Sequence, residues 1–102
     1  MPETTVPLKL DLDGGHDYVR LVCVLNEKGL HARPAAKLAQ AAQRFDSVIT
    51  IVMNGQEVDA KSILDILTLA AGHGANLELR AQGDDAGQAL DALADLFKNR
   101  FQ

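Results

Sequence analysis

The apolar residues of this chain follow two periods that alternate along the sequence, and this alternation constrains the fold more than any other feature. Spacing by two residues predicts strands, and an apolar stripe at every third or fourth residue predicts amphipathic helices. The resulting order is β-α-β-β-α-β-α, which usually places the helices on one face of a four-stranded sheet. The predicted strands span residues 18–25, 48–53, 56–58 and 76–81, and the predicted helices begin at Ala32, Ile63 and Ala86.

Turn and cap residues separate these elements. Asn54-Gly55 is a strong signal for a two-residue hairpin. Ser62 is a good N-cap for the second helix, and Asp65 stands three residues later, where a capping box usually has Glu. The same helix is predicted to end at about residue 70, with Gly72 and Gly74 as its cap and loop glycines.

Residues 1–17 are predicted to form an N-terminal extension to a single domain of residues 18–102. Val6, Leu8, Leu10 and Leu12 alternate with other residues, and a turn signal follows at residues 13–15. We expect an extra strand that forms a hairpin with the strand beginning at Tyr18, and a frayed tail is an equal alternative. Acidic residues and His16 in this region fit a solvated tail better than a metal site.

Composition excludes several classes of protein. The 102 residues carry a net charge of −4, which argues against a nucleic-acid-binding protein. The sequence shows neither a signal peptide nor a membrane-spanning run, so we expect a cytoplasmic protein with no membrane insertion. Cys23 is the only cysteine, which excludes an internal disulfide, and its position between Val22 and Val24 predicts a small core residue.

Residues 29–37 bring together a titratable side chain, a helix start and a fixed positive charge. Pro34 fits only the first turn of a helix, so the helix should begin at about Ala32 and His31 should be its N-cap. Backbone N–H groups and the positive end of the helix dipole then point toward an anion placed at His31. Arg33 adds a permanent positive charge.

His31 is suited to act as a nucleophile. An ordinary imidazole is largely uncharged near neutral pH and keeps a ring nitrogen for attack, and nearby positive charge disfavours the imidazolium. A phosphoryl group is the electrophile that best matches the surrounding donors. The sequence has no phosphate-binding glycine loop or kinase lysine, so it should bind no nucleotide. A simple helix cap and a weak anion site remain open as alternatives.

Two motifs resemble those of a known family. Gly-Leu-His-Ala-Arg-Pro-Ala at 29–35 resembles the active-site motif of HPr, the histidine-containing phosphocarrier family of the bacterial phosphotransferase system. Ala-Lys-Ser-Ile at 60–63 is similar to the second motif of that family, and Ser62 follows His31 by the matching 31 residues. The resemblance extends over residues 18–101. It implies an α+β open-faced sandwich in which three helices cover one face of a four-stranded antiparallel sheet.

The resemblance also implies roles for residues and partners. His31 would be phosphorylated on Nδ1 by the phosphoenolpyruvate-dependent enzyme I, and an enzyme IIA-type acceptor in sugar uptake would then receive the group. Arg33 would hold the phosphoryl group, and Pro34 would fix the helix start. The chain would be a carrier with no cofactor and no bound metal, not an enzyme with its own turnover.

Ser62 and its surroundings suggest regulation and docking. The resemblance implies that an HPr kinase/phosphorylase can phosphorylate Ser62, whereas a serine that only caps its helix is the alternative. Basic residues near His31 and apolar residues of the second helix predict a surface for an acidic, partly apolar partner. The basic residues are Lys28, Arg33, Lys37 and Lys61, and the docking residues are Lys37, Ile63, Leu64, Leu67 and Thr68.

Other functions fit the sequence less well. A regulatory phosphoprotein that signals through His31 and Ser62 without feeding a sugar transporter is the main alternative. A small ligand-binding or RNA-binding module is the third possibility, and RNA binding is disfavoured because the charge is acidic and the strands lack paired aromatic residues for stacking. We expect a monomer, with a dimer through the N-terminal strand as the alternative.

Overall fold

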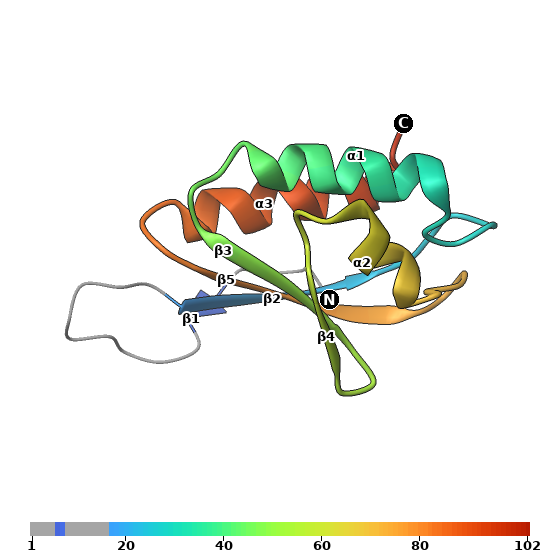
Figure 1. Cartoon of the computed structure of the whole chain (residues 1–102), viewed down its shortest axis with the longest axis horizontal. Helices are drawn as coiled ribbons and strands as arrows, with labels where there is room; N and C mark the ends of the chain where they lie inside the picture. Colours follow the sequence, from blue (N-terminus) through green and yellow to red (C-terminus); the bar gives the residue numbers. More distant parts are fainter. Residues whose placement is uncertain (1–5, 8–16) are drawn as a thin grey trace.

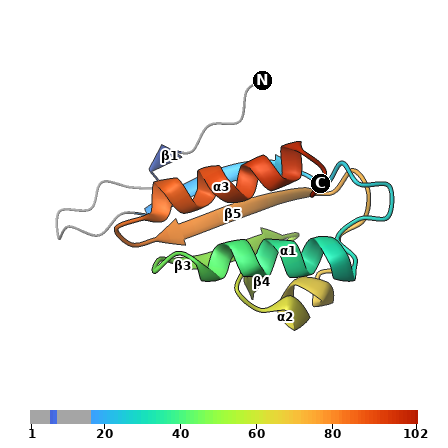
Figure 2. The same ribbon diagram turned by 90° about the horizontal axis from the view of Figure 1, so that it is seen from above.

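The computed structural model describes residues 6–7 and 17–102, which form two layers: an antiparallel sheet and three helices that cover one of its faces (Figures 1 and 2). The strand order across the sheet is β1-β2-β5-β3-β4. None of the described helices is long and apolar enough to cross a membrane. The elements are β1 Val6–Pro7, β2 Asp17–Cys23, α1 Ala32–Gln43, β3 Val48–Met53, β4 Gln56–Asp59, α2 Ile63–Thr68, β5 Asn76–Gln82 and α3 Ala86–Lys98.

The predicted α+β fold is confirmed. Strands β2 to β5 and the three helices occur in the predicted order, and β5 lies centrally because it pairs with both β2 and β3. The register places Leu77 opposite Val22 and Leu79 opposite Ile51. These side chains face the helices together, so the period of two along each strand produces one continuous apolar face.

Strand β1 extends this sheet at its outer edge. Val6 lies opposite Val19 and Pro7 lies opposite Tyr18, in an antiparallel pair with β2. The remainder of the predicted extra strand, its turn at 13–15 and most of the acidic residues near His16 lie outside the described residues. Within the described part, no cluster of three or more His, Cys, Asp or Glu side chains could hold a metal ion. The division into an extension and a domain remains a prediction.

The core lies between the sheet and the helices. Helix α1 buries one stripe that includes Leu38, and α3 buries another that includes Leu90 and Leu93. Both stripes belong to one buried apolar cluster that also includes Ile49 and Ile51 of β3. Burial of each such side chain contributes about 2 kcal/mol. The long faces of α1 and α3 are therefore fixed against the sheet, which fixes the position of the helix ends.

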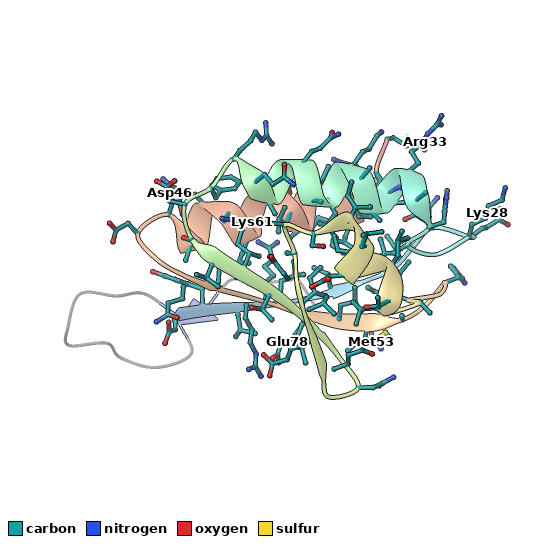
Figure 3. All side chains as sticks on the ribbon, viewed as in Figure 1. Lys28, Arg33, Asp46, Met53, Lys61 and Glu78 are labelled. Carbon is teal, nitrogen blue, oxygen red and sulfur yellow. The ribbon has the colours of Figure 1, made fainter. Side chains whose placement is uncertain are left out.

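The prediction that Cys23 is a core residue is wrong. Val22 and Val24 point into the core, so the alternation of the strand turns Cys23 toward the helix-free face, where it is partly exposed. Leu21 shares that face and is 63% exposed. Glu78 of the neighbouring β5 lies on the same side, away from the helices (Figure 3). The valine neighbours suggested burial, but the period of two decides the orientation.

The end of α2 also differs from the prediction. The helix stops at Thr68 with Leu69 as its C-cap, and the left-handed residue is Ala70, with φ 50°, not Gly72. The last turn tightens because the Leu69 and Ala70 N–H groups donate to the carbonyls three residues earlier. Leu69 and Ala71 are both buried and hold the alanine between them in this conformation.

Asp85 joins the start of β3 to the start of α3. It stands at the N-cap of α3, but its carboxylate does not cap its own helix. Instead it accepts hydrogen bonds from the Asp46 N–H at 2.9 Å, from the Ser47 N–H at 3.0 Å and from the Ser47 hydroxyl. The Ser47 hydroxyl first, and then the backbone N–H of Asp46, lower the pKa of Asp85 below its ordinary value.

We predict that Asp85→Asn lowers the melting temperature at pH 7, because an amide binds these three donors less well than a carboxylate. Because the pKa of Asp85 in the folded protein is below its ordinary value of 3.8, the ionised carboxylate stabilises the fold fully at pH values above 3.8. This stabilisation is lost as the pH falls through the lower pKa of the folded state. Thermal melts from pH 7 down to pH 2 should therefore converge for the two proteins. The exposed neighbour Asp84 supplies the control, and equal effects of Asp84→Asn and Asp85→Asn would contradict the prediction.

Candidate functional site

His31 lies at the N-cap of α1, as predicted. Its backbone is extended, with φ −79° and ψ −169°, and its exposed side chain makes no capping hydrogen bond. The first bond of the helix runs from the Ala35 N–H to the His31 carbonyl at 2.9 Å. The N–H groups of Ala32 and Arg33 consequently have no partner within the helix, and Pro34 has no N–H. Among the described residues, this helix end therefore combines two free N–H donors with an imidazole that makes no capping hydrogen bond.

The loop before His31 is held by close backbone contact. Gly29 has φ 71°, and its N–H donates to the Asn26 carbonyl at 3.0 Å. The next residue, Leu30, is buried and its N–H donates to the Ala71 carbonyl at 2.9 Å. A Cβ atom at Gly29 would lie 2.4 Å from that same carbonyl oxygen. Glycine is therefore required here by both conformation and space.

Three of the four predicted basic residues lie near this end of α1. Arg33 and Lys28 are exposed and lie at the same end of the molecule (Figure 3). Lys37 is half-buried, and its Nζ donates to the Phe101 carbonyl at 2.6 Å, so its head group faces the C-terminal segment and not only solvent. The expectation that Lys61 belongs to this group is wrong, because its Nζ donates to the Phe45 carbonyl at 2.7 Å, beyond the other end of α1.

Ser62 is the N-cap of α2, as predicted. Its half-buried hydroxyl accepts a hydrogen bond from the Asp65 N–H at 3.2 Å. The Asp65 carboxylate approaches the Asp59 N–H at 3.4 Å, so only half of a capping box forms. The Gln43 side chain donates to the Lys61 carbonyl at 2.8 Å, which places the start of α2 beside the end of α1. Ser62 is therefore beside the C-terminal end of α1, whereas His31 lies at its N-terminal end.

The predicted docking residues differ in exposure. Ile63 and Leu64 are 38% and 75% exposed, and they form an apolar surface on the first turn of α2. Thr68 is exposed, although its hydroxyl donates to the Asp65 carbonyl at 2.5 Å. Leu67 packs against the core and contributes less to the surface. The end of α2 is close to His31, because Ala71 contacts the loop before it.

The residues after α3 make contacts near the site that the sequence did not predict. Phe101 is 4% exposed and packs edge-on against Phe97, with ring centroids 5.0 Å apart. Its carbonyl binds Lys37, and the preceding carbonyl, of Arg100, accepts a hydrogen bond from Asn26 Nδ2 at 3.0 Å. The spacing of Phe97 and Phe101 by four residues was an available signal for a shared apolar contact. The hydrogen bonds to backbone carbonyls could not be predicted, because every residue has a backbone carbonyl whatever its side chain.

An open-faced α+β sandwich with an exposed histidine at the N-cap of its first helix has the architecture of a phosphocarrier domain. Residues 19–99 match the family described as "PTS HPr component phosphorylation site". The chain therefore belongs to the HPr family, the phosphocarrier proteins of the phosphotransferase system, which carry phosphoryl groups without catalytic turnover.

Known proteins agree with this assignment. The phosphocarrier protein HPr of Treponema pallidum is 50% identical over 84 residues, which cover 82% of this chain and 96% of that protein. A crystal structure of HPr from Thermoanaerobacter tengcongensis superposes with a TM-score of 0.79 at 40% identity and covers 81% of this chain and 93% of its own. A structure of an HPr dimer from the same organism has a TM-score of 0.68 at 42% identity, with coverage of 78% and 91%.

We predict that Gly29→Ala destabilises the protein by roughly 2 kcal/mol or more, since a left-handed alanine costs about 1–2 kcal/mol before any clash. Gly55→Ala is the matched control, because Gly55 has φ 84° but nothing within 4 Å of its Cβ position. Chemical denaturation of both variants separates the conformational cost, which they share, from the contact with the Ala71 carbonyl. Equal losses of stability would show that the close approach at Gly29 is unimportant.

Proposed function

We propose that His31 accepts a phosphoryl group that originates in phosphoenolpyruvate and reaches this chain from enzyme I. The single observation that carries this proposal is the exposed imidazole at the N-cap of α1, beside the unpaired N–H groups of Ala32 and Arg33. An anion attached to the ring meets these donors and the positive end of the helix dipole. Membership of the HPr family supports enzyme I as the source of the phosphoryl group.

The transfer itself needs little from this chain beyond position. The Nδ1 lone pair of His31 attacks phosphorus, a P–N bond forms, and the bond between phosphorus and its enzyme I donor atom breaks with its electron pair. The proton on the other ring nitrogen stays in place. Arg33 and the N–H groups of Ala32 and Arg33 stabilise the negative charge on the phosphoryl oxygens. Pro34 fixes the start of α1. In the onward transfer a nucleophilic atom of the acceptor attacks phosphorus, and the P–N bond breaks with its electron pair returning to Nδ1 of His31.

The acceptor is proposed to be an enzyme IIA-type component of sugar uptake. Exposed Ile63 and Leu64 supply an apolar contact on α2, while Arg33 and Lys28 supply positive charge beside His31. Thr68 and the exposed part of Leu67 continue this surface, and Lys37 contributes its charge from the edge. A partner with an acidic, partly apolar face would match it.

Phosphorylation of Ser62 by an HPr kinase/phosphorylase is the proposed regulation. The hydroxyl accepts only one hydrogen bond, and a phosphate at a helix N-terminus is electrostatically favourable. Because Ser62 is far from His31, its phosphate would act on partners that contact α2 and not on the imidazole. A protein that used both sites only for signalling, without feeding a transporter, is the second candidate, and exposed Leu64 beside Ser62 is the feature that favours it.

We propose that the monomer is the working state, because β1 of the same chain occupies the outer edge of β2. This pairing covers β2 at Tyr18 and Val19, and a covered part of an edge is less available to a second sheet. Exchange of β1 between two chains would preserve the same pairing and is the route by which a dimer would form. The docking surface lies on the helical face and would remain accessible in either state.

The first test is transfer of labelled phosphate from phosphoenolpyruvate in the presence of enzyme I. Wild-type protein should gain an acid-labile, alkali-stable label, and His31→Ala should lose nearly all of it, because the imidazole is the nucleophile and the nearby Lys28 and Arg33 stay protonated at neutral pH. His73→Ala is the control, since His73 is a second exposed histidine, in the loop after Ala71 and not at the start of α1. An unlabelled wild type, or equal labelling of His31→Ala, would refute the proposal.

A second test concerns Ser62. Ser62→Ala should lose about 1 kcal/mol of stability through the missing cap, whether or not the site is regulatory. With ATP and an HPr kinase/phosphorylase, wild type should gain an acid-stable phosphate that Ser62→Ala lacks. Thr68→Val, which removes a nearby hydroxyl on the same helix, is the control. Labelling of Ser62→Ala at the wild-type level would exclude Ser62 as the modified residue.

A further inference from the structure

We propose that Asn26 is a positioning residue for His31, which acts by tying the turn before His31 to the segment that follows α3. This inference rests on the proposed function of His31 as the phosphoryl acceptor. The Asn26 side chain donates from Nδ2 to the Arg100 carbonyl at 3.0 Å. Its backbone carbonyl accepts the Gly29 N–H at 3.0 Å and closes the turn from which the chain passes into His31.

The position of His31 depends on its backbone. The imidazole makes no capping hydrogen bond, so the loop from residue 26 to residue 30 decides where the ring lies relative to the start of α1. Within the described part of the chain, two hydrogen bonds attach that loop to other segments. Leu30 is held by the Ala71 carbonyl on the α2 side, and Asn26 is held by the Arg100 carbonyl on the α3 side. Loss of the second attachment leaves the turn held from one side only.

The segment that accepts this bond is itself held firmly. Phe101 is buried against Phe97, and its N–H donates to the Leu96 carbonyl at 2.8 Å. Arg100 and Phe101 adopt left-handed backbone conformations, with φ 54° and 59°, which non-glycine residues rarely adopt. Lys37 of α1 binds the Phe101 carbonyl. The Arg100 carbonyl thus binds the turn at Asn26, and the Phe101 carbonyl binds α1. Both the turn and α1 are therefore connected to the end of α3.

The hydrogen bonding of the Asn26 side-chain amide is incomplete, which is unfavourable for a residue that serves only stability. Its Oδ1 is buried and has no hydrogen-bond partner within the described part of the chain. A buried acceptor without a partner opposes folding and offsets the benefit of the Nδ2 bond. Leucine, which is close to asparagine in size, would remove both the donor and the unpaired oxygen. Asn26→Leu should therefore change stability little while it releases the turn, which separates positioning from stability.

The experiment measures phosphoryl transfer from enzyme I to full-length wild type, Asn26→Leu and Asn26→Asp. Asn26→Asp keeps the shape but turns an acceptor toward the Arg100 carbonyl. We expect kcat to fall about tenfold in both variants, because small displacements of a reacting atom are costly. KM for this protein should stay within about twofold of wild type, because the docking surface on α1 and α2 is unchanged. Asn76→Leu and Asn76→Asp, at an exposed position on β5, are the matched controls.

Thermal melts and the ¹⁵N spectrum of the His31 ring accompany the kinetics. A shifted His31 ring signal in a folded Asn26→Leu protein, together with the fall in kcat, supports the inference. Unchanged kcat in both Asn26 variants, a loss confined to KM, or an equal loss in the Asn76 controls would overturn it. If Asn26→Leu did not fold, Asn26→Asp alone would decide the question by the same criteria. Failure of the proposed function is a different result, because wild type itself would then carry no label on His31.

Discussion

The hydrogen bond from the Leu30 N–H to the Ala71 carbonyl is the contact on which the site depends. It joins the loop before α1 to the segment after α2, two parts of the chain that are 41 residues apart, and it is worth about 1 kcal/mol directly. Its larger effect is geometric, because Gly29 passes so close to the same oxygen that no other residue fits. Pro34 sets the start of α1, and this approach sets where that helix start lies relative to the segment after α2.

Much of this arrangement was predictable because local rules determine it. Pro34 fixed the start of α1 at Ala32, and the hairpin at Asn54-Gly55 fixed the boundary between β3 and β4. Local rules failed where tertiary packing decides. Ala70 rather than a glycine takes the left-handed conformation after α2, because its buried neighbours hold it there. Cys23 faces away from the core although its neighbours are buried.

Side-chain bonds to distant backbone carbonyls were beyond the reach of sequence patterns. Lys37 and Lys61 both looked like free surface charges, yet each binds a backbone carbonyl, and these two bonds lie toward opposite ends of α1. The basic surface is consequently smaller and closer to His31 than the sequence suggested. Ser62 lies away from it, so a phosphate there and a phosphate on His31 would act on different parts of a partner. The C-terminal segment is connected to the site instead, since its Arg100 carbonyl accepts a hydrogen bond from Asn26 in the turn that leads to His31.

Nuclear magnetic resonance of the ¹⁵N-histidine-labelled, phosphorylated protein tests the central claim most directly. After reaction with phosphoenolpyruvate and enzyme I, phosphorus should couple to Nδ1 of His31 and to no other histidine nitrogen. The backbone amide protons of Ala32 and Arg33 should shift together, because they donate to the phosphoryl oxygens. Coupling to Nε2, coupling to another histidine, or unshifted amides at Ala32 and Arg33 would contradict a phosphoryl group held at the start of α1.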